Sequence, residues 1–80
     1  MKERKILLIR WHDATSYGEE WQSNGKFKPV DTLTVGFLMK ETKKRITVCQ
    51  SYADNKQINQ VLTIPRGCIL SIVELKYEVL

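Results

Sequence analysis

The stretch Asp31–Tyr52, DTLTVGFLMKETKKRITVCQSY, decides the fold. In its first half, apolar residues such as Leu33 and Val35 alternate with threonine and glycine, and the alternation resumes at Ile46 and Val48 after a basic run. Alternation with a period of two in two adjacent runs is typical of paired β-strands. The stretch therefore predicts a β-hairpin with a basic turn.

The segments on either side of this hairpin predict three more strands. Val61–Ile64 and Cys68–Leu75 are apolar runs that flank Pro65-Arg66-Gly67. Proline cannot donate to a strand ladder and glycine permits a tight reversal, so this tripeptide predicts a turn before the last strand. Lys5–Trp11 predicts the first strand. It carries apolar residues on both faces, which is typical of a strand covered on two sides or of a subunit contact.

Two polar segments connect these strands. Residues 12–30 are rich in Gly, Ser, Asp and Asn and include Asn24-Gly25, a strong turn signal, so they predict a long first loop. Residues 53–60 predict a second, exposed loop. Loops longer than about 12 to 15 residues in a compact domain are commonly functional.

Residues 1–80 are therefore predicted to form one small all-β domain. Five short strands, a long first loop and a tight turn before the last strand are the layout of a small five-stranded barrel of the SH3-like or Sm-like type. An OB-fold-like barrel is the alternative, and it ranks second because it would need longer strands.

Composition excludes several classes of protein. The chain is 42% hydrophobic and 28% charged, which is typical of a globular protein rather than a disordered or disulfide-rich one. Its longest apolar run, Ile6–Ile9, is far shorter than the roughly 20 residues that span a bilayer, and no signal-peptide cleavage site follows it. We expect a cytoplasmic protein with no membrane association. Cys49 and Cys68 are then expected to be free thiols, with a disulfide between them as the alternative.

No set of residues predicts catalysis or metal binding. His12 and Asp13 are adjacent in sequence directly after Trp11, and adjacent side chains along a strand point to opposite faces. One histidine and two separated cysteines do not form a zinc set, and phosphate-loop and nucleophile-elbow motifs are absent from the sequence. We expect a protein that is not an enzyme and that uses no cofactor or metal.

Aromatic residues gather in and before the first loop. They are Trp11, Tyr17, Trp21 and Phe27. Loop aromatics offer a large contact area at low entropic cost, which makes these four residues candidates for binding a protein partner. A lid packed over the open end of the barrel is the other interpretation, and the two are compatible.

Basic residues gather at the hairpin tip. The chain has a net charge of +4, and the candidates are Lys40, Lys43, Lys44 and Arg45, with Arg66 at another turn. Basic groups beside exposed aromatics suit nucleic acid or a nucleotide, because they neutralise phosphate while rings stack on bases. The alternative interpretation is a solvated tip whose lysines protect an edge strand from aggregation.

The chain resembles a group of small proteins encoded by bacteriophages and prophages. The residues that carry the resemblance are Val35–Glu41, Ile46–Val48 and Thr63–Ile69, preceded by Trp11 and Asp13. The pattern of the group is Trp-x-Asp, then a Ser/Thr-Val-Gly-aromatic-Leu strand, then Ile-Pro before a last strand, with Phe here where Trp is common. The resemblance covers about residues 5–75. It implies a phage context and the cytoplasm of a bacterial host, and it brings no catalytic residues.

These observations give two hypotheses for function. The first is a non-enzymatic phage or prophage accessory protein that binds a host protein or protein complex, as an inhibitor or anti-defence factor. The second is a nucleic-acid-binding or nucleotide-binding homo-oligomer of Sm-like barrels, since self-association would add core to a small domain.

Overall fold

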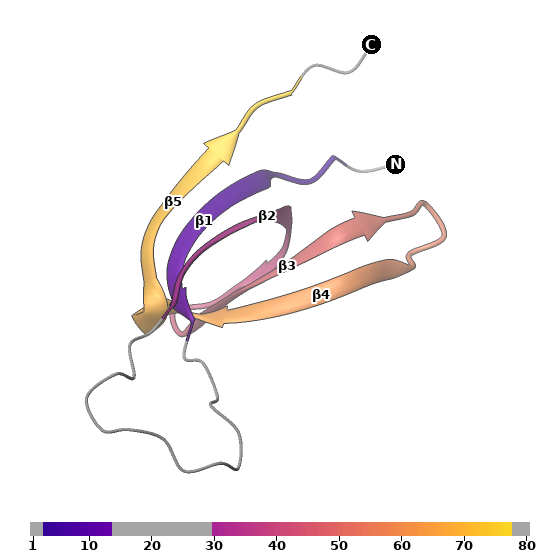
Figure 1. Ribbon diagram of the computed structural model, residues 1–80. Helices are drawn as coiled ribbons and strands as arrows, with labels where there is room; N and C mark the ends of the chain where they lie inside the picture. The colour runs from indigo at the N-terminus through magenta and orange to yellow at the C-terminus, as the bar shows by residue number, and fades with distance from the viewer. Residues whose placement is uncertain (1–2, 14–29, 78–80) are drawn as a thin grey trace, which may run out of the picture.

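The computed structural model describes residues 3–13 and 30–77, which form one antiparallel sheet (Figure 1). The strands are β1 (Ile6–Asp13), β2 (Val30–Glu41), β3 (Arg45–Tyr52), β4 (Ile58–Pro65) and β5 (Ile69–Leu75). Their order in the sheet is β4-β3-β2-β1-β5. Among these residues the only helical segment is the 3₁₀ turn η1 (Arg66–Cys68), which lies between β4 and β5. The predicted all-β class and five strands are confirmed.

The predicted hairpin is β2 and β3, and Thr42 shapes its turn. The hydroxyl of Thr42 accepts hydrogen bonds from the amides of Lys44 and Arg45, each at 3.2 Å. The amide of Thr42 donates to the carbonyl of Arg45 at 2.9 Å. A threonine hydroxyl can take the place of a ladder bond in this way, so the basic residues lie on a defined turn.

β4 is longer than the sequence predicts. The sequence predicts a polar loop that includes residues 58–60, but β4 begins at Ile58. The strand starts there because Ile58 pairs with Tyr52 and Asn59 pairs with Ser51 through the backbone. The pairing omits Gln60, whose φ of 52° is unusual for a residue with a side chain. Backbone pairing thus extends this edge strand through polar residues.

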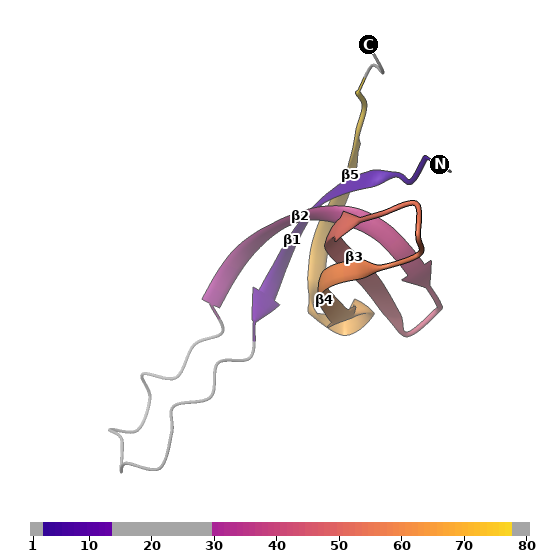
Figure 2. The ribbon, with the colours of Figure 1, turned by 90° about the vertical axis from the view of Figure 1, so that its right-hand side faces the viewer.

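The sheet bends strongly, and Figure 2 shows the curve of β2. Gly36 of β2 is buried against β3. A Cβ at this position would lie 2.9 Å from Cβ of Val48 and 3.1 Å from the carbonyl oxygen of Cys49. Only glycine fits such an approach without displacing the neighbouring strand.

The core lies on one face of this bent sheet. It is built from Leu7, Ile9 and Trp11 of β1, Ile46 and Val48 of β3, and Ile64 of β4. Leu38, Cys68 and Ile69 pack against it from β2, η1 and the start of β5. The indole Nε1 of Trp11 donates to the hydroxyl of Thr34 at 2.9 Å, which satisfies the polar atom that its burial would otherwise leave unpaired.

The expected closed barrel is not confirmed. β4 and β5 lie at opposite edges of the sheet, and no ladder joins them. Closure requires every strand to have two neighbours, and in the sheet that the described residues form, β4 and β5 have one each. Strand number and turn positions are the same for an open and a closed sheet, which is why the sequence did not distinguish them.

Both cysteines are free thiols, with Cys49 buried and Cys68 half-buried. No helix within residues 3–13 and 30–77 has the length and apolar character needed to cross a membrane.

Gly36→Ala is expected to destabilise the fold by roughly 1–3 kcal/mol, because the added methyl overpacks the contact with Val48. Urea unfolding followed by circular dichroism measures the effect. Gly67→Ala is the matched control, since nothing lies within 4 Å of a Cβ at that position. Equal stability of the two variants would contradict the role given to Gly36.

Candidate functional site

The face of the sheet opposite the core carries a second set of apolar side chains. Alternation in β1 turns Ile6 and Leu8 away from the core that contains Leu7 and Ile9. Residues directly opposite each other in an antiparallel pair share a face, so the register extends this set across three strands. The outer face, as we call it, consists of Leu33, Val35 and Phe37 of β2, Ile6 and Leu8 of β1, and Val73 and Leu75 of β5.

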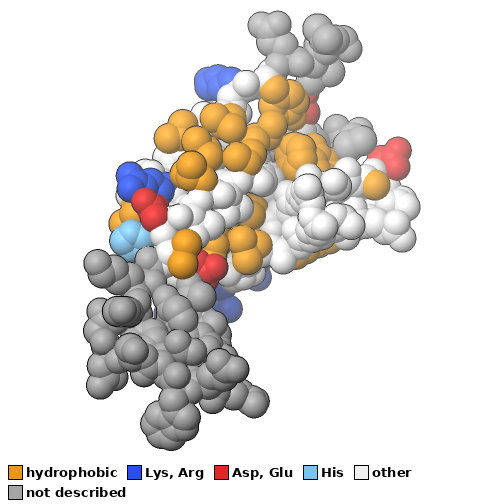
Figure 3. Space-filling view, in the orientation of Figure 1, with side chains coloured by type: hydrophobic (Ala, Val, Ile, Leu, Met, Phe, Trp, Pro, Cys, Tyr) orange, Lys and Arg blue, Asp and Glu red, His pale blue; other side chains and the backbone are white. Residues whose placement is uncertain are grey.

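The outer face is exposed. The exposed fractions of Leu33, Val35 and Val73 are 68%, 57% and 50%. Leu8 lies between Val35 and Val73 in the register, so these apolar groups form one continuous row. Figure 3 shows hydrophobic side chains gathered over β1 and β5. Contiguous apolar surface of this kind marks an interaction site more often than scattered exposed residues do.

Arg10 and Asp31 form a charged border at one end of the outer face. Arg10 is opposite Leu33, and its guanidinium makes three hydrogen bonds to the carboxylate of Asp31, at 2.7, 3.1 and 3.3 Å. The bond from Arg10 holds the pKa of Asp31 below its ordinary value of 3.8. A polar rim beside an apolar centre is the usual anatomy of a protein interface.

An apolar hollow lies at the other end of the outer face. It has a volume of about 500 Å³ and is lined by Ile6, Phe37, Ser51, Tyr52 and Tyr77. The rings of Phe37 and Tyr52 meet edge to face, with centroids 4.9 Å apart. A hollow with aromatic walls can receive one anchoring side chain of a partner.

β5 adds an unpaired strand edge to this surface. All of its residues from Leu70 to Leu75 are exposed, and β1 is its only neighbour in the described sheet. Its pairing with β1 is regular from Ser71 onward. A regular edge of this kind can accept an extended segment as an additional strand.

The predicted basic residues are brought together at the β2–β3 turn. Arg66, distant in sequence, donates from Nε to the carbonyl oxygen of Thr42 at 2.9 Å and lies 3.4 Å from the carboxylate of Glu41. Lys40, Lys43, Lys44 and Arg45 are exposed around the same turn. A groove of about 300 Å³ beside them is lined by Lys40, Thr42, Arg45, Thr47 and Thr63.

The predicted aromatic set is placed only in part. Trp11 is 7% exposed and belongs to the core. Tyr17, Trp21 and Phe27 lie outside the described residues. The sequence pattern did not single out the outer face as a site, although apolar residues on both faces of Lys5–Trp11 were a signal for it.

Within residues 3–13 and 30–77, no three His, Cys, Asp or Glu side chains group closely enough to hold a metal ion. Comparisons with protein-family models, with curated proteins and with solved structures found no match to this chain. We therefore infer function from the surfaces described above.

Arg10→Gln is expected to raise the pKa of Asp31 toward its ordinary value, because the variant loses the bond that favours the carboxylate. The stabilisation from this pair is present above the pKa of the unfolded chain and is lost as pH falls through the lower folded pKa. Carboxyl NMR titration of both proteins measures the difference. An unchanged pKa of Asp31 in the variant would contradict this cause.

Proposed function

We propose that the chain is a non-enzymatic binding protein that engages a protein partner through the outer face. The observation that supports this proposal best is the row Val35, Leu8 and Val73, apolar and uncovered in the described structure. Burying one such side chain at a contact contributes roughly 1.5–3 kcal/mol, so three adjacent positions supply the centre of an interface.

The surroundings of the row favour an ordered contact. Arg10 and Asp31 supply charge at the rim, and the aromatic hollow beside Phe37 supplies a place for an anchor. The free edge of β5 lets an extended segment of the partner pair with the backbone while its side chains cover Val73. We therefore infer that the partner presents an exposed strand or extended segment with alternating apolar residues.

We also propose a phage setting for this binding protein. The resemblance to phage and prophage proteins favours an accessory protein that acts in the cytoplasm of a bacterial host and inhibits or redirects a host protein. The strand order and the 3₁₀ turn before β5 favour a relative of the SH3-like and Sm-like barrels in which β4 and β5 remain apart.

Val35→Lys is expected to weaken partner binding by roughly tenfold or more, because it places a charge at the centre of the row. The partner is captured from a lysate of the host bacterium, purified, and titrated by calorimetry against each variant. Val30→Lys is the control: Val30 is in the same strand, has a similar exposed fraction of 49% and lies outside the outer face.

Two results would overturn this proposal. In the first, Val35→Lys and Val30→Lys bind the purified partner as tightly as the original chain. In the second, ultracentrifugation of the pure protein shows self-association that Val35→Lys abolishes, and no other protein binds. The outer face would then be a contact between copies of this chain.

The basic residues around the β2–β3 turn support a second candidate function, which is binding of single-stranded nucleic acid. The observation that favours it is the position of Arg66 against the β2–β3 turn, which adds a basic residue distant in sequence to the basic residues of the turn. Thr47 and Thr63, whose hydroxyl oxygens are 2.9 Å apart, add hydroxyl groups to the groove beside Lys40 and Arg45. Lysine, arginine and hydroxyl groups are the usual partners of phosphate oxygens.

Affinity for a labelled single-stranded oligonucleotide is expected to fall with salt. Replacing Lys43 and Lys44 by Gln should reduce the slope of log K against log salt by about 0.7 for each phosphate that the variant no longer neutralises. Fluorescence anisotropy at several salt concentrations measures this slope, with Lys76→Gln as the control. An unchanged slope in the double variant, or an equal change in the control, would exclude this function for the turn.

A further inference from the structure

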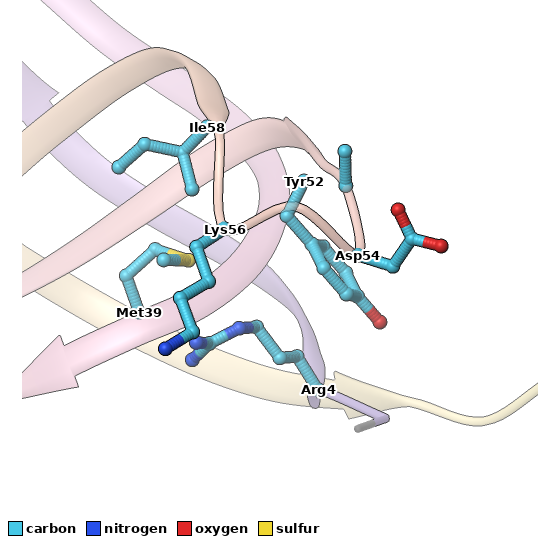
Figure 4. A pocket seen from close by; sticks show the side chains of 7 residues that line it. Arg4, Met39, Tyr52, Asp54, Lys56 and Ile58 are labelled. Atoms are coloured by element: carbon cyan, nitrogen blue, oxygen red, sulfur yellow. The ribbon is translucent and has the colours of Figure 1, made fainter. Parts of the chain in front are cut away.

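A pocket opens at the turn between β3 and β4, at the opposite end of β3 from the basic turn. It has a volume of about 460 Å³, within the range of small-molecule sites. Figure 4 shows its lining, which comes from the segment before β1, the end of β2 and the β3–β4 turn. The lining residues are Arg4, Met39, Tyr52, Ala53, Asp54, Lys56 and Ile58.

Two cations face the same part of this pocket. In Figure 4 the charged ends of Arg4 and Lys56 point toward one another, and the carboxylate of Asp54 points away from both. The ion pairs found among residues 3–13 and 30–77 involve neither Arg4 nor Lys56. Like charges brought together repel, and an anion between them would favour both charged forms.

Arg4 is held in position by its neighbours. Its Nη1 donates to the carbonyl of Leu38 at 3.4 Å, and its Cζ lies 5.6 Å from the centroid of the Tyr52 ring. Phe37 fixes this ring by an edge-to-face contact. A guanidinium that is positioned before binding loses less freedom when it meets an anion.

The backbone at Lys56 is unusual. Its φ is 70°, in the left-handed region where glycine is the least strained residue. Hydrogen bonds fix the turn: the amide of Lys56 donates to the carbonyl of Ala53 at 3.1 Å, and the amide of Ala53 donates to the carbonyl of Gln57 at 2.9 Å. The chain thus places a lysine where a glycine would relieve strain, and strain at a pocket is a reason to infer a function for the residue.

The rest of the wall suits a flat apolar group. Met39, Tyr52 and Ile58 contribute a thioether, an aromatic ring and a branched aliphatic group beside the two cations. Guanidinium and ammonium groups bind phosphate through charge-assisted hydrogen bonds, and bases pack against aromatic and apolar side chains. We propose that the pocket binds a nucleoside monophosphate, with its phosphate between Arg4 and Lys56 and its base against Met39, Tyr52 and Ile58.

The test is calorimetry of the purified chain with AMP, GMP, CMP and UMP, and with inorganic phosphate and the four free nucleosides. At least one nucleotide is expected to bind roughly tenfold more tightly than phosphate and than its own nucleoside. Lys56→Gly removes the charge and suits the turn, so it should weaken that nucleotide roughly tenfold without loss of thermal stability. Arg4→Gln should weaken it similarly.

Lys76→Gln is the control for net charge, because Lys76 follows β5 and does not line the pocket. It is expected to bind the nucleotide as the original chain does. The proposal is overturned if none of the four nucleotides binds, if the Lys56→Gly variant binds as the original chain does, or if Lys76→Gln weakens binding equally. Equal affinity for inorganic phosphate or for the nucleoside would also overturn it.

Discussion

The close approach of Gly36 to Val48 is the constraint on which the rest of the described structure depends. It lets β2 lie close against the paired strand β3 without a side chain between the two backbones, and the sheet can bend there. As a result, β1 shares one apolar cluster with β3 and β4, although it is not a neighbour of either strand in the sheet. With no α-helix among the described residues, the bend encloses this cluster. The same bend leaves the outer face uncovered, so the core and the proposed binding surface have one cause.

The sequence predicted the structural features that depend on residues close together in the chain. Alternation located β2 and β3, and Pro65 and Gly67 located the turn that η1 forms. Closure was not predictable in this way, because it depends on how far the sheet bends and not on where its strands lie. The early start of β4 was missed because Asn59 joins the ladder through its backbone, which leaves no apolar pattern.

The candidate sites were predictable to different degrees for similar reasons. Composition located the basic turn, but the hydrogen bond from Arg66 to Thr42 joins residues that only the fold brings together. The pocket at the β3–β4 turn had no sequence signal. Arg4 reaches it from the segment before β1, and the left-handed conformation of Lys56 is a property of the backbone. β3 connects these two cationic regions, since it begins at Arg45 beside one and ends at Tyr52 beside the other.

The two edges of the open sheet differ, and the difference limits how the protein can assemble. On β4 the left-handed Gln60 and the terminal Pro65 interrupt the row of backbone groups that another strand would need. β5 carries no proline and remains regular from Ser71 to Leu75. Strand addition is therefore directional: the sheet can grow beyond β5 but not beyond β4. Fibre growth requires two compatible edges on every molecule, so assembly at β5 ends after a single added partner.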